Sequence, residues 1–335
     1  MPFGTLLLGL SQERNRAIPS LESAGPPLQL TGVRSKAIGL AAALVTVVIW
    51  SGWIVATRYS AETELGPIDI GLLRYGLPAI VLAPVWWRCR PLPRNVPLLP
   101  LGIMLAGSGA PFLLIAAAGM RFAPAAEIGA LLPGTMPLWA ALIGCLLGTA
   151  RFARRQILGY VLIGMGIAAI AAGDFHHAQP WTQPAKGNAL SAAWLGHGLF
   201  LMAAMFWAAY SHAFKKTGLT ALQAAAITAF WSFLCHLALA IVFGSRIGQI
   251  GVAVWLPQLL IQGGLSGLIA IVAYGIAVRQ LGATRAAAFS ALVPALTLLG
   301  GLLLLGESVQ PLTSLATACV TFGVALATGL QRSGK

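Results

Sequence analysis

The chain has 335 residues, of which 58% are hydrophobic and only 9% are charged, and its mean hydropathy is +0.84. A soluble domain carries about a quarter of its residues as charged groups, so this composition excludes globular enzymes, nucleic-acid-binding proteins and secreted disulfide scaffolds. The net charge of +13 does not indicate a nucleic-acid partner, because the Lys and Arg residues stand in short clusters between apolar runs. The remaining class is that of integral membrane proteins.

Residues 1–35 differ from the rest of the chain in containing prolines, mixed charges and only one short apolar run, Thr5 to Leu10. A cleaved signal peptide places positive charge before a longer apolar core. Here Arg14 and Arg16 follow a weak core. We therefore predict a disordered cytoplasmic tail over residues 1–35, with a misassigned start codon as the alternative.

From Lys36 onward the sequence consists of apolar runs, each long enough to cross a bilayer as a helix of about 20 residues. Their length and the lack of alternating polarity exclude strands, so the predicted fold class is an all-α integral membrane protein. The ten predicted transmembrane helices cover residues 37–58, 67–87, 96–119, 124–148, 156–173, 190–213, 220–243, 252–278, 284–305 and 310–330.

The loop charges predict the orientation of these spans, because Lys and Arg residues near span ends are retained in the cytoplasm. Of the 21 Lys and Arg residues, sixteen lie in the two terminal segments and in alternate loops, whereas the opposite loops hold only Arg121, Lys186 and Arg246. Both termini are therefore expected in the cytoplasm of a bacterial-type inner membrane. This orientation requires an even number of spans and independently supports ten.

The chain also contains an internal repeat. A shift of 157 residues places Trp50 on Trp207, Pro137 on Pro294 and Gly144 on Gly301. The predicted repeats cover residues 36–173 and 190–330, with a periplasmic loop at residues 174–189. Because each repeat has five helices, an odd number, the second repeat is expected to be inverted relative to the first, as in many secondary transporters.

Three stretches resemble the EamA-type repeats of the drug/metabolite transporter superfamily. They are IWSGWIVATRYSAETELGPIDIGLLRYGLPAIVLAP (residues 49–84), PAAEIGALLPGTMPLWAALIGCLLG (124–148) and GATRAAAFSALVPALTLLGGLLLLGES (282–308). The resemblance covers residues 37–330. It implies a ten-helix inner-membrane carrier whose central cavity is lined by the first, third, fourth, sixth, eighth and ninth helices, and many similar proteins export amino acids or other small metabolites.

One departure from the family pattern concerns the Leu-Gly-Glu sequence that usually closes the fourth helix of a repeat. The second repeat keeps it as Leu305, Gly306 and Glu307, whereas the first repeat has Gly148, Thr149 and Ala150 at the positions aligned with it. Any role of this acid is therefore expected in one half only.

Prolines near the middle of a span are the first indication of a substrate site, because unwound backbone offers polar groups where lipid offers none. The candidates are Pro111, Pro133, Pro137 and Pro294, of which Pro111, Pro137 and Pro294 lie near mid-depth in their predicted helices. The stretch Pro133 to Pro137, which includes Thr135, is especially unfavourable for a helix. Ordinary kinks that pack against a neighbouring helix are the alternative.

Buried ionisable groups are the second indication, since a charge in the bilayer core costs at least ~3 kcal/mol. Glu127 lies about one turn inside the fourth predicted helix. It could bind a substrate ammonium or carry a coupling proton, or it could be hydrated or paired with Arg121. Asp69, Arg74 and Arg58 are interpreted as interfacial groups that extend toward the membrane surface.

Aromatic residues of the first helix of each repeat are the third indication. Trp50 and Trp53 correspond to Trp207 and Tyr210, and the spacing of three places each pair on one helical face. Such rings could hold an apolar or cationic metabolite by stacking or cation–π contact, although core packing and contact with lipid remain open. Gln258 and Gln262 form a polar stripe that serves either as interhelical hydrogen-bonding groups or as substrate contacts.

These considerations select a set of candidate substrate-binding residues. They are Trp50, Trp53, Pro111, Glu127, Thr135, Pro137, Trp207, Tyr210, Gln262, Ser290 and Pro294. Asp174, His176 and His177 are the one cluster that resembles a metal site. No metal site is expected there, because adjacent histidines rarely bind one ion together and no further ligand is suitably spaced. No cofactor is expected either, and the lack of a Gly-x-x-x-x-Gly-Lys-Ser/Thr sequence argues against direct use of ATP.

The predicted function is secondary transport of a small organic metabolite, such as an amino acid, across the inner membrane by alternating access. Export is favoured by the resemblance alone. An intramembrane enzyme acting on a lipid or isoprenoid is the main alternative, but such chemistry needs clustered acids, histidines or a metal, whereas the eight carboxylates of this chain are scattered. A passive channel is a third option. The expected partners are the substrate and the lipid bilayer, and close-packing glycine motifs leave a homodimer open.

Overall fold

The computed structural model describes residues 32–61, 65–149, 152–176, 189–281, 286 and 288–328. Residues 38–335 form one compact unit, distinct from residues 1–37. Residues 1–31 of the predicted tail and 177–188 of the predicted periplasmic loop lie outside the described residues. The described ends of both regions are helical, since the first helix begins at Gly32 and the fifth span ends at His176.

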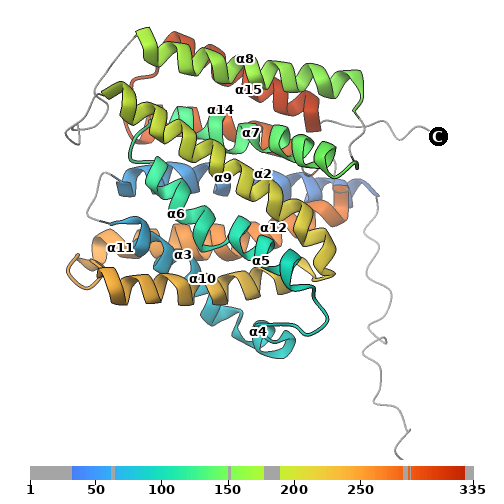
Figure 1. Cartoon of the computed structure of the whole chain (residues 1–335), viewed down its shortest axis with the longest axis vertical. Helices are drawn as coiled ribbons and strands as arrows, with labels where there is room; N and C mark the ends of the chain where they lie inside the picture. Colours follow the sequence, from blue (N-terminus) through green and yellow to red (C-terminus); the bar gives the residue numbers. More distant parts are fainter. Residues whose placement is uncertain are drawn as a thin grey trace, which may run out of the picture. The chain divides into compact units, whose positions relative to one another are not determined.

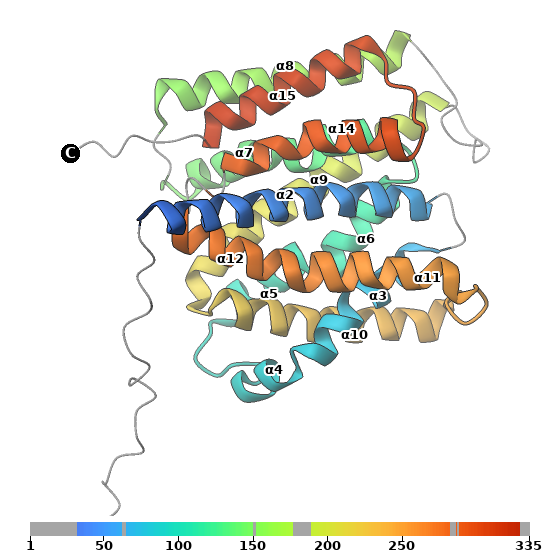
Figure 2. The same cartoon turned by 180° about the vertical axis from the view of Figure 1, so that it is seen from behind.

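The described part of the chain is helical and contains no strand, and its helices lie side by side (Figures 1 and 2). The α-helices are α2 (Gly32–Ala61), α3 (Pro67–Val81), α4 (Ala83–Cys89), α5 (Leu98–Ser108), α6 (Ala110–Gly119), α7 (Ala125–Leu146), α8 (Arg154–His176), α9 (Ala189–Thr217), α10 (Ala221–Phe243), α11 (Val252–Gln258), α12 (Ala270–Leu281), α14 (Leu292–Leu304) and α15 (Pro311–Thr328). A π-helix, η3 (Leu259–Ile269), joins α11 to α12, and a 3₁₀ turn, η4 (Phe289–Ala291), precedes α14.

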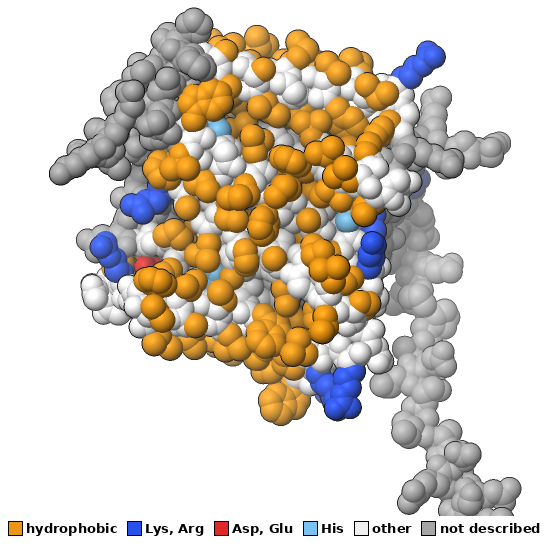
Figure 3. All heavy atoms as spheres, in the orientation of Figure 1, with side chains coloured by type: hydrophobic (Ala, Val, Ile, Leu, Met, Phe, Trp, Pro, Cys, Tyr) orange, Lys and Arg blue, Asp and Glu red, His pale blue; other side chains and the backbone are white. Residues whose placement is uncertain are grey.

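Eight helical segments in the described ranges are long and apolar enough to cross a membrane. The pair α3 and α4, bent by 72°, would make a ninth, and Phe289–Leu304 is apolar but shorter. Large apolar side chains such as Leu146, Ile241 and Leu304 are at least 76% exposed. Hydrophobic atoms cover the face in Figure 3, and its Lys and Arg side chains lie around the edge. This surface suits lipid and not water.

The positions of the helix breaks correct one expectation from the sequence. Helix α7 runs unbroken through Pro133 and Pro137, although each proline removes one backbone hydrogen bond. The prolines are four residues apart and therefore lie on one helical face, which confines both losses to that face. Instead, the α3–α4 span bends at Leu82, because Pro84 cannot donate to the carbonyl of Ile80.

A second break separates α5 from α6 at Gly109, two residues before Pro111. The backbone N–H of Ala110 is freed by this break and donates to Oγ of Ser232 on α10, at 3.1 Å. The sequence offered Pro111 as one of four candidate positions for a break, and the break lies two residues before it. Pro294 instead lies in the first turn of α14, after the 3₁₀ turn.

Helices α8 and α15 pack closely along their length and lie side by side in both views (Figures 1 and 2). A Cβ atom on Gly159 would lie 2.6 Å from the Gly323 carbonyl oxygen, and one on Gly166 would lie 2.8 Å from the Ala316 carbonyl oxygen. As residue numbers rise along α8, those of the contacts on α15 fall. The two helices are therefore antiparallel, and only glycine permits their backbones to approach so closely.

Candidate functional site

A cavity of about 290 Å³ lies among the helices of both repeats. Its volume is at the small end of ligand pockets, which are typically ~300–1,000 Å³. Apolar and aromatic side chains make up most of the wall. The lining residues are Trp50, Trp53, Arg74, Phe112, Leu132, Pro133, Met136, Pro137, Ala140, Trp207, Ala208, Ser211, Tyr274, Ser290, Val293 and Thr328.

Aromatic rings from four helices follow one another around this wall. The ring centroids of Trp53 and Phe112 are 6.3 Å apart, and those of Phe112 and Trp207 are 5.2 Å apart. On the other side, Trp50 and Tyr274 are separated by 5.5 Å. Such tilted and offset pairs are favourable arrangements of aromatic rings and form a surface suited to planar, apolar molecules.

The structure places Trp50, Trp53, Pro137, Trp207 and Ser290, all among the predicted site residues, on the wall of the cavity. The other aromatic candidate, Tyr210, does not line it and instead packs against Trp207, with ring centroids 5.2 Å apart. The sequence pattern identified the face of the first helix of each repeat that lines the cavity, but not how far along that face the cavity extends.

The remaining predicted residues also lie outside the cavity lining. Thr135 is buried and donates to the carbonyl of Leu131, one turn earlier on its own helix. Pro294 is buried within α14, whereas Pro111 is exposed at the start of α6. Gln262 is fully buried and donates to Oγ1 of Thr57 at 2.8 Å, which is an interhelical bond between the eighth and first spans.

Glu127 forms a buried pair with His197 on α9, with 3.0 Å between Oε2 and Nε2. The sequence offered Arg121 as its partner, but Arg121 is exposed and no bond between these two side chains is found in the described residues. The pair is held between α7 and α9, apart from the aromatic cavity. Because the partner lies 70 residues away, local spacing gave no indication of it.

The side chains of Asp69 and Arg74 do not extend toward the surface, as the sequence suggested that they would. Asp69 is 3% exposed and accepts hydrogen bonds from Oγ of Ser245 and from the backbone N–H of Arg246, at 2.6 and 3.1 Å. It therefore fixes the connection between α10 and α11. Arg74 points into the cavity, where its guanidinium carbon lies 4.6 Å from the centre of the Trp53 ring.

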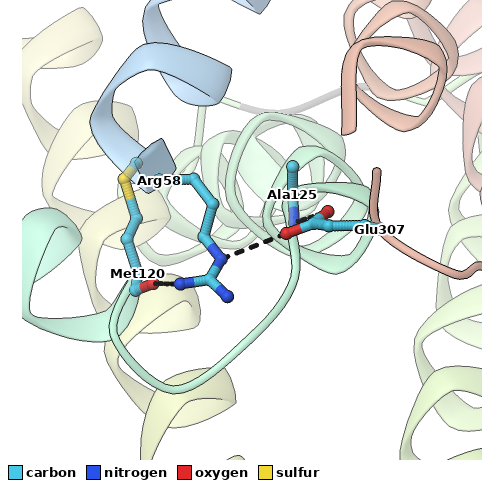
Figure 4. A network of polar contacts seen from close by, with 4 residues as sticks. All are labelled: Arg58, Met120, Ala125 and Glu307. Carbon is cyan, nitrogen blue, oxygen red and sulfur yellow. Dashed lines mark hydrogen bonds and ion pairs between the residues drawn. The ribbon is translucent and has the colours of Figure 1, made fainter. Parts of the chain in front are cut away.

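Arg58 is also buried, contrary to the interpretation of this residue as an interfacial anchor. Figure 4 shows its guanidinium between the carbonyl of Met120 and the carboxylate of Glu307. Arg58 Nε lies 3.2 Å from Glu307 Oε1, Nη1 donates to the Met120 carbonyl at 3.3 Å, and Ala125 N–H donates to Glu307 Oε2 at 2.8 Å. This Arg58–Glu307 network joins α2, the α6–α7 connection and the end of α14.

The structure also shifts the alignment of the two repeats by one residue at the Leu-Gly-Glu sequence. Gly148 and Gly306 both have φ of +65°, a conformation that favours glycine. The N–H of Thr149 then bonds the Gly144 carbonyl as that of Glu307 bonds the Gly301 carbonyl, at 2.9 and 3.1 Å. Thr149 therefore stands where Glu307 stands in the second repeat, so the corresponding position in the first repeat has no acid.

Metal-binding side chains do not gather at the cavity. The part of the chain that the structure describes contains no group of three or more His, Cys, Asp or Glu side chains able to hold an ion. The Asp174, His176 and His177 cluster lies outside the residues whose side chains are described.

These features define the class of the protein, which is a multi-pass α-helical membrane protein with a small aromatic cavity between its two halves. The EamA-like transporter family matches residues 37–172 and again residues 194–329, so the chain belongs to this family. The resemblance found in the sequence is thereby confirmed, and the family consists of membrane transporters of small molecules.

The comparison with solved structures supports the fold alone. One structure, described as "Crystal structure of protein", has a TM-score of 0.57 and 17% sequence identity, over 88% of this chain and 96% of that chain. A comparison with curated proteins gives no significant match.

Proposed function

We propose that this protein is a secondary carrier for a small organic metabolite and works by alternating access in the inner membrane. The observation that carries the proposal is the cavity itself. Its wall combines Trp50 and Trp53 of the first repeat with Trp207 and Tyr274 of the second. A site shared by two halves can be exposed to either side when the halves move relative to one another.

The proposed architecture has ten spans arranged as two inverted repeats of five. The packing of α8 and α15, the last helices of the two repeats, supports the inversion. When the two repeats are aligned by a shift of 157 residues, Gly159 corresponds to Ala316 and Gly166 corresponds to Gly323. The contact between Gly159 and Gly323 is therefore equivalent to the contact between Ala316 and Gly166. A two-fold relation between antiparallel copies has this property.

The Arg58–Glu307 network supports a conformation that is closed on one side. It joins the end of α2 that follows the cavity residues Trp50 and Trp53 to the α6–α7 connection and the end of α14. By the loop charges this side is periplasmic, and both termini lie in the cytoplasm. Export remains the favoured direction because of the family resemblance alone.

The enzyme alternative has no comparable support. An intramembrane hydrolase or transferase needs an activated nucleophile, a general acid and base, or a metal close to its substrate. Among the described residues, the cavity wall carries the hydroxyls of Ser211, Ser290, Thr328 and Tyr274 and the guanidinium of Arg74, but no carboxylate or histidine.

Reconstitution of the purified protein in liposomes tests the proposal. We expect metabolite flux that saturates and shows counterflow, meaning that unlabelled substrate inside accelerates uptake of labelled substrate. Flux that rises linearly with concentration and shows no counterflow would indicate a channel, and conversion of a lipid would indicate an enzyme. Fusing reporters to both ends tests the architecture, because ends on opposite faces contradict ten spans.

A further inference from the structure

The cavity contains a cation, Arg74, and no carboxylate whose side chain the structure describes is bonded to it. Arg74 of α3 lines the wall, and its Nη1 donates to Oγ of Ser266 at 3.0 Å. Its guanidinium carbon lies 4.6 Å from the Trp53 ring centre and 5.9 Å from that of Tyr75. These neutral groups use only part of the five N–H donors of an arginine and leave its positive charge in place.

The three carboxylates whose side chains the structure describes are each bonded elsewhere. Asp69 binds Ser245 and Arg246, Glu127 binds His197, and Glu307 binds Arg58. A charged side chain within the bilayer core is costly, and such residues almost always find a partner or mark a substrate path. The charge of Arg74 thus favours a ligand that brings the missing anion.

A second donor lies beside this cation. The indole N–H of Trp53 is buried and has no hydrogen-bond partner among the described residues, although Trp53 lines the cavity. An indole N–H can only donate, so a buried one lacks an acceptor and not a donor. Acceptor oxygens of a ligand would satisfy both groups.

The aromatic wall alone could bind either an apolar or a cationic metabolite. The positive charge of Arg74 disfavours the cationic one. The Arg74 guanidinium already lies over the face of Trp53, which is where a cationic ligand would bind by cation–π contact. A second cation in the same small cavity would be repelled. The remaining rings of Trp50, Phe112, Trp207 and Tyr274 offer apolar contact to a planar body.

We propose that the cavity binds a small organic acid, whose carboxylate is held by Arg74 and the Trp53 N–H while its apolar, planar part packs on the aromatic wall. This proposal rests on the proposed carrier function and names the substrate class. Arg74 is then the residue that makes the cavity selective for an anionic substrate.

A series of four probes with one carbon skeleton tests this selectivity. The probes are 3-phenylpropionate, phenylalanine, 3-phenylpropionamide and 3-phenylpropylamine, which are respectively anionic, zwitterionic, neutral and cationic. Binding of radiolabelled 3-phenylpropionate to the purified full chain is measured by equilibrium dialysis, with the other three compounds as competitors. We expect the anion to bind most tightly, the zwitterion less tightly, and the amide and amine most weakly.

Two substitutions then assign the effect to Arg74. Arg74→Gln is expected to weaken binding of the acid about tenfold or more, because hydrogen bonds to charged groups are the strong ones, and to leave binding of the amide little changed. Arg74→Lys keeps the charge but not the planar group and is expected to fall between Gln and the native residue. Arg121→Gln removes an exposed arginine outside this cavity and serves as the matched control.

The outcomes separate this inference from the carrier function. Three results would each overturn the proposed substrate class. The amine could bind more tightly than the acid, Arg74→Gln could weaken binding of the acid and of the amide equally, or the native protein could fail to bind the acid. If the acid binds in an Arg74-dependent manner but no probe shows counterflow in liposomes, the substrate class stands and the carrier function fails. Monodisperse elution and unchanged thermal unfolding of the variants exclude misfolding as the cause.

Discussion

Arg58 and Glu307 are buried charges that depend on one another. In the interior of a protein, removal of one partner of such a pair typically costs ~3–5 kcal/mol, because the remaining buried charge loses this pairing. We expect Glu307→Gln and Arg58→Met each to lower the temperature of thermal unfolding clearly. The double variant should lose less than the sum of the single losses, since the second substitution removes a pairing that the first has already broken.

The repeat supplies a control for this experiment. Thr149 occupies the position in the first repeat that Glu307 occupies in the second, and Thr149→Val removes no charge. Its unfolding temperature should change little. Additive losses in the double variant would show that the two side chains are not energetically coupled.

The pair of Glu127 and His197 is the candidate for proton coupling. Both groups are buried and 3.0 Å apart, and a buried pair of Glu and His within the spans is a candidate proton relay. We expect Glu127→Gln to flatten the dependence of the liposome transport rate on pH. Arg121→Gln should leave this dependence unchanged, and an unaltered pH profile in Glu127→Gln would remove the acid from any coupling role.

The tryptophans of the cavity give a prediction for apparent affinity. Trp50 and Trp207 each present a ring to the cavity wall, and an aromatic contact contributes ~0.5–1.5 kcal/mol beyond the area that it buries. Trp50→Ala and Trp207→Ala are therefore expected to raise the apparent KM in counterflow about two- to tenfold. Trp87, which is 76% exposed, supplies the matched Ala variant, and normal KM values in both cavity variants would contradict an aromatic substrate site.

At the scale of elements, the α8–α15 contact depends on glycine. A Cβ atom on Gly323 would lie 2.7 Å from the Gly159 carbonyl oxygen and 2.9 Å from the backbone nitrogen of Ile163. Neither backbone can yield without separation of the helices, and overpacking of this kind costs ~1–3 kcal/mol. We expect Gly323→Ala to lower the unfolding temperature in detergent.

Gly164 on the same helix pair is the matched control, because a Cβ atom there would meet nothing within 4 Å. Gly164→Ala should be neutral or slightly stabilising, since alanine favours a helix over glycine. Equal changes in unfolding temperature for Gly323→Ala and Gly164→Ala would mean that the close contact between α8 and α15 does not contribute to stability.

Helix positions could be predicted from the sequence far better than helix shape. Apolar runs of about 20 residues located the segments from α2 to α15, because no other arrangement satisfies backbone groups in lipid. The same reasoning expected a break at Pro133 to Pro137, where α7 is continuous, and missed the 72° bend at Leu82. A proline weakens a helix locally, but its neighbours decide whether the helix bends.

The site residues show the same limit at the scale of the whole molecule. The repeat located Trp50 and Trp207 because equivalent positions in two halves meet at the same cavity. Partners that are distant in sequence were not accessible, since Arg58 and Glu307 are 249 residues apart. Arg74 was visible as a charge inside an apolar span, but only the packing of α3 shows that it turns toward the cavity and away from the membrane surface.

The difference between Glu307 and Thr149 makes the two ends of the molecule unequal. The Arg58–Glu307 ion pair joins the helices at one end. At the other end, the equivalent residue Thr149 has a hydroxyl group and no charge. In the absence of substrate, the protein is therefore expected to favour the conformation whose cavity opens on the side of the chain termini. Passage in the reverse direction must begin by separating two buried charges, so the forward and return rates of the empty protein are expected to differ.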